Sequence, residues 1–420
     1  MKALIVERRP LRFAAARMAA AFGSGKGAGV GPVRLATIDA PAIGRPGWFE
    51  VAPLLAGICG SDLATVDGKS SRYFEDIVSF PFVPGHEVVG LLRSDALDAH
   101  GHQLEAGTRV VIQPVLGCEA RGLAPCEWCA TGQIGRCANL DHGHLKPGLQ
   151  TGFCADTGGG WSDGPLLAHT SQIFCVPDSL SDDDAVTVEP MACAVHAALR
   201  AGATNDDVVA IIGAGTLGLG VLAALGFLAD HGHSERPGKV IIGARYATQR
   251  SMASALGADV VVPPDQLSRA VRNATRSLVV GRPTGTSGQL AGGAHVVVDC
   301  VGSDDSLTQS LELCRPGGRI VVVGMPGKVT LDLAALWHRE VIMTGAYAYG
   351  LEATLLGEVA TFDLAIEMAH ALSTGQLVSA RYPLDRFEEA LAHAGQAGPR
   401  GAIKIVFDVG GKKTATRREA

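Results

Sequence analysis

The chain has 420 residues and a formal net charge of −6 at pH 7, and 47% of its residues are hydrophobic. This length predicts two or three domains of ordinary size. The apolar content excludes disorder as the main state. The acidic balance excludes the broad basic surface that nucleic-acid binding requires, so we expect no nucleic-acid partner.

Ten cysteines raise the question of disulfide bonds. Four of them lie within Cys118–Cys137, a density that favours a metal site. Met1–Pro10 carries charges where a secretory signal would be apolar, and a chain of this size needs no disulfides to complete its core. We therefore expect no secretory signal and a reducing, cytoplasmic setting.

The first 185 or so residues predict irregular β structure, because Gly, Pro, Cys and His interrupt short apolar runs such as Thr108–Val115. From about residue 191 to 344, apolar runs alternate with stretches of helical length. This alternation predicts a parallel sheet with helices on both faces. The expected strands are Val208–Gly213, Lys239–Gly243, Val260–Val262, His295–Val301, Arg319–Gly324 and Val341–Gly345.

Beyond residue 345 we expect a helix at Phe362–Leu372 and a strand at Ala402–Phe407. Gly281–Gly293 reads as a loop, and the basic tail from Gly410 as a solvated end without a function. Val208–Ala229 is long and uncharged enough to suggest a membrane span. Its five glycines and strand-like start favour a buried strand, turn and helix instead, so we expect no membrane span.

A nucleotide site is expected in this alternating region. A G-x-G-x-x-G pattern follows the strand at Val208 and opens a helix at Leu219–Leu228, which is the context that a dinucleotide fingerprint needs. An ordinary strand–helix turn in a glycine-rich chain is the alternative. In the nucleotide reading, the glycines make the tight turn, admit the pyrophosphate and let the helix pack closely, and the helix N-terminus binds the phosphates. The residues are Gly213, Gly215, Thr216, Leu217 and Gly218.

The residue after the second strand predicts which nicotinamide nucleotide binds. Arg245 stands where Asp or Glu would favour NAD. A guanidinium there can bind a 2′-phosphate, and Arg250 lies close enough in sequence to assist. The sequence favours NADP over NAD, the alternative being a surface arginine beside a site that tolerates NAD.

Four cysteines follow the spacing Cys118-x7-Cys126-x2-Cys129-x7-Cys137. A C-x-x-C pair with two further thiolates supplies the four ligands of a closed tetrahedral zinc, which is structural because no position stays open for substrate. Free cysteines and a redox C-x-x-C are the alternatives. The surrounding Gly, Pro, Arg and Glu are unlike the apolar surroundings of buried free cysteines.

Three further motifs complete a pattern that spans most of the chain. They are CGSD at Cys59–Asp62, GHE at Gly85–Glu87 and Glu189-Pro190. With the cysteine cluster and the glycine fingerprint, their order and rough spacing resemble the zinc-dependent alcohol dehydrogenases of the medium-chain dehydrogenase/reductase superfamily. GHE followed by a later Glu-Pro resembles the polyol and threonine dehydrogenase branch, since other branches have a cysteine where Glu189 stands.

The resemblance implies a role for each motif residue. Cys59 and His86 are implied to bind a catalytic zinc, with Glu87 and Glu189 as alternative or joint oxygen ligands. Asp62 is implied to orient the zinc-binding histidine. Ser61 is implied to pass the substrate proton toward the nicotinamide ribose. Two zinc ions per chain are expected, one catalytic and one structural.

The resemblance also implies an α/β fold with a GroES-like β-barrel catalytic domain and a doubly wound, parallel Rossmann sheet. We expect the catalytic domain at 1–190, the dinucleotide-binding domain at 191–344 and a return to the catalytic domain at 345–420. The implied activity is hydride transfer between a small secondary alcohol, polyol or similar substrate and NAD(P). Such proteins form dimers or tetramers, and Val341–Gly345 is a candidate edge strand for pairing.

Two other classes of function remain as alternatives. A zinc-free NADPH reductase of quinones or enones would lack the Cys59 and His86 pair, and a non-enzymatic NADPH-binding protein would lack a ligand or Ser61; this chain has all three. The sequence departs from the family at the long spacer after Cys118, at Ala64, where a histidine often stands, and at Arg12–Gly31, an apparent insertion to which we assign no role.

Overall fold

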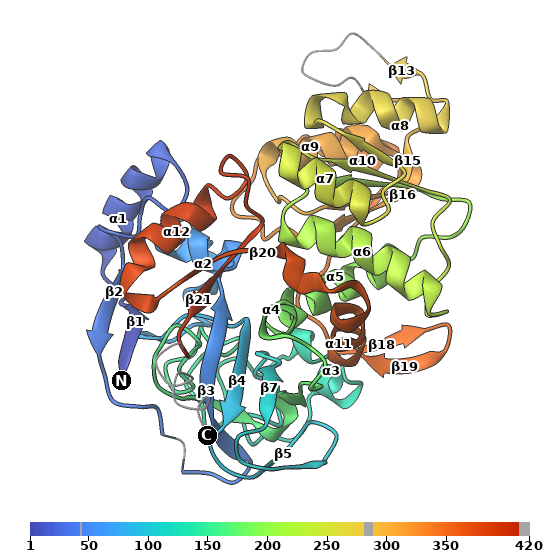
Figure 1. Ribbon diagram of the computed structural model, residues 1–420. Helices are drawn as coiled ribbons and strands as arrows, with labels where there is room; N and C mark the ends of the chain where they lie inside the picture. Colours follow the sequence, from blue (N-terminus) through green and yellow to red (C-terminus); the bar gives the residue numbers. More distant parts are fainter. Residues whose placement is uncertain (43, 281–288, 411–420) are drawn as a thin grey trace. The chain divides into compact units, whose positions relative to one another are not determined.

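The computed structural model describes residues 1–42, 44–280 and 289–410, and the chain divides into two compact units (Figure 1). Unit 1 comprises Met1–Glu189 and Ala365–Ala420, and unit 2 comprises Pro190–Leu364. The sequence analysis placed the return to the first unit at residue 345. In the structure, residues 345–364 belong to unit 2. Within this unit, Glu352 Oε1 lies 2.5 Å from His196 Nδ1. The basic tail and residues 281–288 of the expected loop lie outside the described residues.

Unit 2 contains a six-stranded parallel sheet in the order β12-β11-β10-β15-β16-β17. The chain winds outward from β10 in one direction and then, from β15, in the other. This is the doubly wound Rossmann arrangement expected from the sequence. The strands are β10 (Val208–Ile212), β11 (Lys239–Gly243), β12 (Val260–Val262), β15 (Ala294–Asp299), β16 (Cys314–Val322) and β17 (Ile342–Gly345).

Helices cover both faces of this sheet (Figure 1). On one face, apolar residues of α8, α9 and α10 join the strands in a single buried cluster. α6 is nearly all buried, and with β10 it divides the uncharged stretch at 208–229 into a strand and a helix. Within the described residues no helix is long and apolar enough to cross a membrane. The helices are α5 (Val188–Ala201), α6 (Thr216–Asp230), α7 (Ala247–Ala255), α8 (Leu267–Thr275), α9 (Asp304–Leu313) and α10 (Ala334–His338).

Two hairpins complete unit 2. β13 (Val279–Val280) pairs with β14 (Gln289–Leu290), so the described end of the expected loop is a short strand. β18 (Leu351–Thr354) pairs with β19 (Gly357–Ala360), and this hairpin ends in the exposed Leu355 and Leu356.

Unit 1 is built on a mainly antiparallel, seven-stranded sheet in the order β20-β21-β3-β4-β7-β9, with β8 also pairing with β3. Both ends of the chain contribute, because β21 pairs with β3 in a register that sets Val406 opposite Gly57. This is the GroES-like domain expected from the sequence. The strands are β3 (Trp48–Gly57), β4 (Val88–Leu92), β7 (Arg109–Ile112), β8 (Leu166–His169), β9 (Ile173–Cys175), β20 (Val378–Tyr382) and β21 (Lys404–Asp408).

The other elements of unit 1 surround this sheet. β1 and β2 pair with each other, and their inward side chains join those of α2, α12 and β21 in one buried cluster. α1 begins the apparent insertion and lies beside α12 (Figure 1). These elements are β1 (Lys2–Val6), α1 (Pro10–Ala19), β2 (Val33–Thr37), α2 (Gly60–Val66), β5 (Ala96–Leu97), β6 (Gln103–Leu104), α3 (Glu127–Ala130), α4 (Asp182–Ala185), α11 (Thr361–Leu372) and α12 (Phe387–Gly395).

Candidate active site and metal sites

The first turn of α2 brings three predicted site residues together. Cys59 is the N-cap of this helix, and its backbone N–H donates to Asp62 Oδ2 at 2.9 Å. A carboxylate at the third helical position satisfies a free N–H at the helix start, which fixes the orientation of Asp62. Ser61 lies between them and is half-buried.

His86 and Glu87 reach the same place from the turn before β4. That turn requires glycine at position 85, which has φ +97° and where a Cβ would lie 2.4 Å from Cδ1 of the buried Trp161. One ligand atom each from Cys59, His86 and Glu87 lies within 4.8 Å of the others. A thiolate, an imidazole and a carboxylate this close form a donor set that suits zinc.

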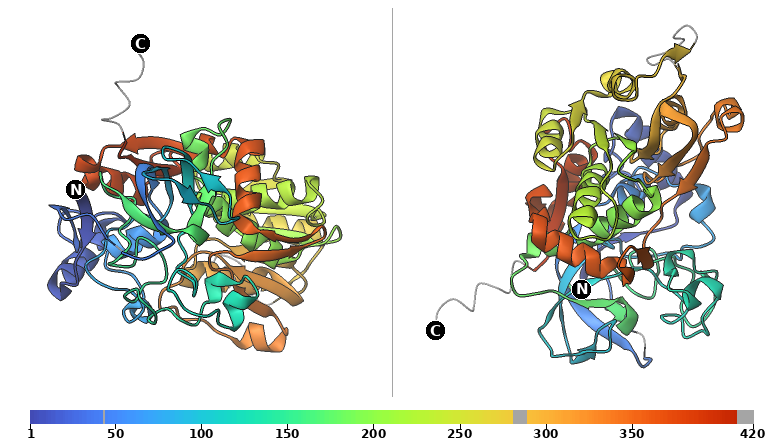
Figure 2. Two further views of the ribbon diagram at one scale, coloured as in Figure 1. Left: turned by 90° about the horizontal axis from the view of Figure 1, so that it is seen from below. Right: turned by 90° about the vertical axis from the view of Figure 1, so that its right-hand side faces the viewer.

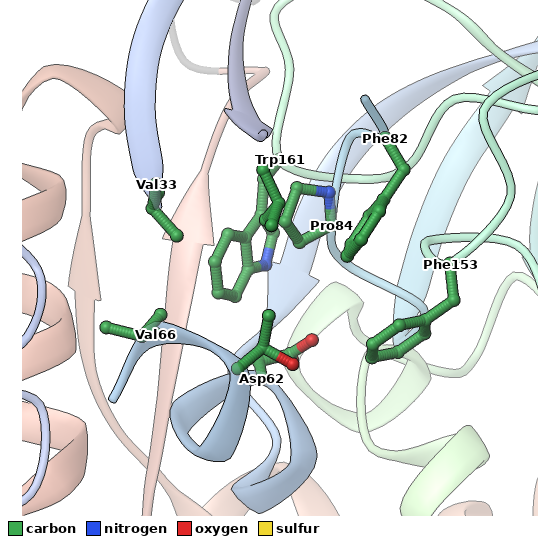
Figure 3. Close-up of a pocket in the computed structure, with 9 residues that line it drawn as sticks. Val33, Asp62, Val66, Phe82, Pro84, Phe153 and Trp161 are labelled. Atoms are coloured by element: carbon green, nitrogen blue, oxygen red, sulfur yellow. The ribbon is translucent and has the colours of Figure 1, made fainter. Parts of the chain in front are cut away.

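Asp62 lies next to the imidazole ring of His86. Its Oδ1 lies 3.5 Å from His86 Nδ1, and both side chains are almost fully buried. Burial alone would lower the pKa of His86, but the carboxylate of Asp62 and the thiol of Cys59 outweigh it and hold that pKa well above its usual value. Figure 3 shows Asp62 beside Pro84, Phe153 and Trp161, which line a small apolar pocket. Asp62 therefore has His86 and the backbone N–H of Cys59 as polar neighbours, with little space for water.

Glu87 has a partner that the sequence analysis missed. Lys404 Nζ forms an ion pair with Glu87 Oε2 and donates to the Ile58 carbonyl at 3.2 Å, and both charged side chains are at most 3% exposed. Burial would lower the pKa of Lys404, but the carboxylate of Glu87 outweighs it and raises that pKa. Gly57 leaves the necessary room, since a Cβ there would overlap Glu87. A lone lysine within the apolar run at 402–407 was the signal available in the sequence.

Glu189 lies on the first turn of α5 and is largely buried. Its carboxylate also contributes to the raised pKa of Lys404, behind the larger effect of Glu87. It does not belong to the group formed by Cys59, His86 and Glu87 among the described residues. The structure thus brings Glu87, rather than Glu189, to the predicted ligands.

The four cysteines of the 118–137 lobe converge as a second group, with their sulfurs within 4.8 Å of one another. Cys118, whose long spacer departs from the family, is included, and its Sγ lies 3.6 Å from that of Cys137. The lobe is mostly loop around the short helix α3 (teal in Figures 1 and 2). Backbone and side-chain N–H groups point at the sulfurs: Cys126 N and Asn139 Nδ2 lie 3.3 and 3.2 Å from Cys118 Sγ.

The pKa values of three of these thiols are shifted in different directions. Hydrogen bonds from the backbone of Ala138 and from Cys129 lower the pKa of Cys126 to about 6. Burial raises the pKa of Cys129 and of Cys137. A cation is needed to hold all four as thiolates near neutral pH, which fits a zinc ion.

Arg121, inside the long spacer, was also missed by the sequence analysis. Its guanidinium is fully buried and donates to the Leu116 carbonyl at 3.1 Å and to the His142 carbonyl at 3.1 Å. It also donates to the carbonyls of Lys146 and Gly148. The extra residues therefore form a turn around one cation that joins several loops of the lobe.

The glycine fingerprint in unit 2 has the geometry of a nucleotide turn. Gly213 has φ +91°, and a Cβ on Gly218 would lie 1.9 Å from the Gly213 carbonyl oxygen. Gly215 is the N-cap of α6, and a Cβ there would meet nothing within 4 Å. The turn and the close helix contact thus need glycine, and the space at Gly215 is open for a phosphate to approach.

The two predicted arginines behave differently. Arg245 follows β11 and is exposed. Arg250, on α7, donates from Nη1 to the Arg245 carbonyl at 2.7 Å. Arg250 therefore fixes the backbone that presents Arg245.

Comparisons with known proteins identify the family. A family model described as "Alcohol dehydrogenase GroES-like domain" matches residues 45–178, and one described as "Zinc-binding dehydrogenase" matches residues 222–369. L-idonate 5-dehydrogenase of Vitis vinifera is 25% identical over 388 residues, covering 91% of this chain and 93% of that protein. The chain belongs to the zinc-dependent medium-chain dehydrogenase family.

Other relatives agree with this assignment. Sorbitol dehydrogenase of Ovis aries is 27% identical, over 86% of this chain and 90% of that protein. A zinc-binding dehydrogenase of Sinorhizobium meliloti 1021, solved with NADP, shares the fold with a TM-score of 0.64 at 23% identity, over 90% of this chain and 95% of that one. The protein is an alcohol dehydrogenase that uses zinc and a nicotinamide nucleotide. The zinc-free and non-enzymatic alternatives are not favoured.

Proposed function

We propose that Cys59, His86 and Glu87 hold the catalytic zinc of this dehydrogenase. The observation that carries the proposal is their convergence within 4.8 Å in front of the buried Asp62. Three protein ligands leave one position open for substrate, which distinguishes a catalytic zinc site from a structural one. Glu87 is the oxygen ligand in this proposal. Glu189, the other candidate, is close enough to Lys404 to contribute to its raised pKa.

The four cysteines at 118, 126, 129 and 137 hold a second, structural zinc in this proposal. Their sulfurs form one group, and four thiolates complete a tetrahedral shell. The protein would then contain two zinc ions per chain with different accessibility.

In this proposal each residue of the site has a separate role in alcohol oxidation. Zinc held by Cys59, His86 and Glu87 would supply a Lewis acid that lowers the pKa of an alcohol, and a nicotinamide nucleotide would supply the hydride acceptor. Asp62 holds the proton on His86 Nδ1, which keeps Nε2 free as a ligand. Ser61 Oγ accepts the hydroxyl proton of the substrate and gives up its own proton toward the nicotinamide ribose. Ala64 offers no side chain for the next step, so water completes this proton path.

We further propose a preference for NADP, because Arg245 is exposed at the end of β11 where an acidic residue would bind the ribose of NAD. The substrate in this proposal is a polyol or a related secondary alcohol, supported by the relatives named sorbitol and L-idonate dehydrogenases. A homo-oligomer is supported by β17, which ends the sheet and exposes 55% of Ile342.

The first experiment is a count of zinc in the purified protein before and after mild chelation, with turnover of sorbitol and of simpler secondary alcohols measured in parallel. We expect two zinc ions per chain, one of which leaves readily together with the activity and restores it when returned. A single tightly held zinc with undiminished turnover would refute the proposed catalytic site.

A further inference from the structure

The segment Arg12–Gly31, to which the sequence analysis assigned no role, ends in a glycine-rich loop with the sequence GSGKGAG at 23–29. Loops of this composition present converging backbone N–H groups that bind anions. Here the anion is a side chain of the same protein. The Asp67 carboxylate accepts from Gly25 N at 2.9 and 3.1 Å, from Gly27 N at 3.1 Å and from Ser24 Oγ at 3.0 Å.

This contact is buried and sterically specified. Asp67 is 0% exposed. Gly25 has φ +80°, and a Cβ on it would lie 2.2 Å from the Leu391 carbonyl oxygen. A Cβ on Gly27 would lie 2.3 Å from the Val66 carbonyl oxygen. Both glycines are therefore required for the loop to approach the carboxylate.

The insertion also packs against α12, and two further hydrogen bonds reach the same end of α2. Arg17 Nε donates to the Gly68 carbonyl at 3.1 Å, and Lys69 Nζ donates to the Ala20 carbonyl at 3.4 Å. Gly68 has φ +64°, and a Cβ there would lie 2.5 Å from a carbonyl oxygen of α1. Asp67 is the C-cap of α2. The insertion therefore contacts the C-terminal end of this helix and the next two residues, Gly68 and Lys69.

The opposite end of the same helix begins with Cys59, Ser61 and Asp62. α2 has seven residues, or roughly 10 Å of rigid helix at about 1.5 Å per residue. A short helix tilts as one body, so a contact that fixes its C-terminal end also fixes the position of its N-cap.

We propose that the Arg12–Gly31 insertion is a brace that sets the orientation of α2, and that Asp67 is a positioning residue for the proposed zinc ligand and proton relay. Asp67 touches neither substrate nor metal. It acts through the helix, and the inference rests on the proposed function of Cys59 and Ser61.

The test compares Asp67→Asn with a control that destabilises unit 1 elsewhere. Asparagine keeps the size of the side chain but loses the charge and places an N–H group against the loop amides. Leu104→Ala removes a buried side chain from the separate cluster within the sheet of unit 1. Each full-length protein is measured well below its melting temperature for kcat, KM and the visible spectrum after cobalt replaces the catalytic zinc.

For Asp67→Asn we expect kcat to fall roughly 10- to 100-fold, as for a misplacement of reacting groups by about 1 Å, with a changed cobalt spectrum. Leu104→Ala is expected to lower the melting temperature while leaving the spectrum and kcat near those of the parent. If Asp67→Asn lowers only the melting temperature, the brace is a structural contact alone and the inference is wrong.

Arg17→Met provides a milder variant, should Asp67→Asn fail to fold, because it removes one hydrogen bond of the brace made by an exposed residue. A smaller change of the cobalt spectrum in the same direction supports the inference, and an unchanged spectrum contradicts it. Failure of the proposed function has a different signature. In that case the parent protein itself would bind no removable metal at this site, and the zinc count of the parent protein would show this without any variant.

Discussion

The two candidate metal sites of unit 1 are built in opposite ways. The four-cysteine lobe takes all of its ligands from a single stretch, and its partners Arg121 and Asn139 come from the same or an adjacent loop. The catalytic cluster combines a helix N-cap, a turn before β4 and a lysine near the end of the chain. One site is local, uniform and closed, and the other is assembled over long range from three kinds of ligand.

The two sites therefore depend on different parts of the domain. Four thiolates satisfy zinc without help from the rest of the domain, so the lobe depends mainly on its own loops. The catalytic cluster keeps an open position at the cost of burying the charges of Glu87 and Lys404, and buried charges depend on exact pairing. Changes to the cluster should therefore affect chemistry and stability of the whole domain, whereas changes to the lobe should act locally.

The largest effect is expected from Cys59→Ala. Removing one of three ligands should lower turnover by about a thousandfold or more, because zinc stabilises the reacting oxygen by several kcal/mol. The lobe should keep its zinc, so the count should fall from two to one per chain. Cys175→Ala, at an exposed cysteine, serves as the control and should change neither quantity. Full activity in Cys59→Ala would remove the distinction between the two sites.

Lys404→Met should destabilise unit 1 by about 3 kcal/mol, because it leaves the Glu87 carboxylate buried without its cation. Denaturant unfolding with and without zinc measures this effect. If Glu87 is a ligand, added zinc should increase the free energy of unfolding of Lys404→Met more than that of the parent protein. Equal increases in the two proteins would instead favour Glu189 as the oxygen ligand. Lys404→Arg keeps the charge and should lose less.

Arg121→Met should act on the lobe alone. It removes the donor that several buried carbonyl groups share, at a cost of about 2 kcal/mol. Release of the structural zinc to a chromogenic chelator should become about tenfold faster, in line with the loss of other groups that support ligands. Arg121→Lys retains the charge and should release zinc at an intermediate rate. Faster loss of the catalytic zinc in Arg121→Met would contradict the independence of the two sites.

The smallest effect is expected in unit 2, which holds neither of the two candidate metal sites. Arg245→Asp should shift the ratio of kcat/KM for NADP over NAD toward NAD by about fivefold, since one exposed charge contact contributes about 1 kcal/mol. Arg250→Met should shift it less, because Arg250 holds the backbone of Arg245. An unchanged ratio in Arg245→Asp would remove the support for NADP.

The sequence predicted the parallel sheet well because most of its strands are short apolar runs, although β16 starts at Cys314, before the expected Arg319. Val260–Val262 and Lys239–Gly243 coincide with β12 and β11. The hairpin of β18 and β19 was not predicted, since half-exposed strands with Glu and Thr have no strong apolar pattern. The expected helix at Leu219 begins at Thr216, directly after the glycine turn.

The metal ligands were predicted from their residue types, but their supporting partners were not. Lys404 reaches Glu87 only because β21 pairs with β3 in a particular register, which local sequence does not specify. Arg121 looks like any surface arginine until the loops close around it. Asp67 was overlooked for a similar reason, because its partners lie about 40 residues earlier in the chain.

The pairing of Lys404 with the catalytic cluster also has a consequence for biosynthesis. Lys404 follows Ile58, whose carbonyl it binds, by 346 residues. At about 5–20 residues per second, a ribosome needs roughly 20 to 70 seconds to make the intervening chain. During that interval Cys59, His86 and Glu87 of the nascent protein have no lysine beside them. The buried ion pair between Lys404 and Glu87 is therefore among the last contacts of unit 1 that can form as the chain is made.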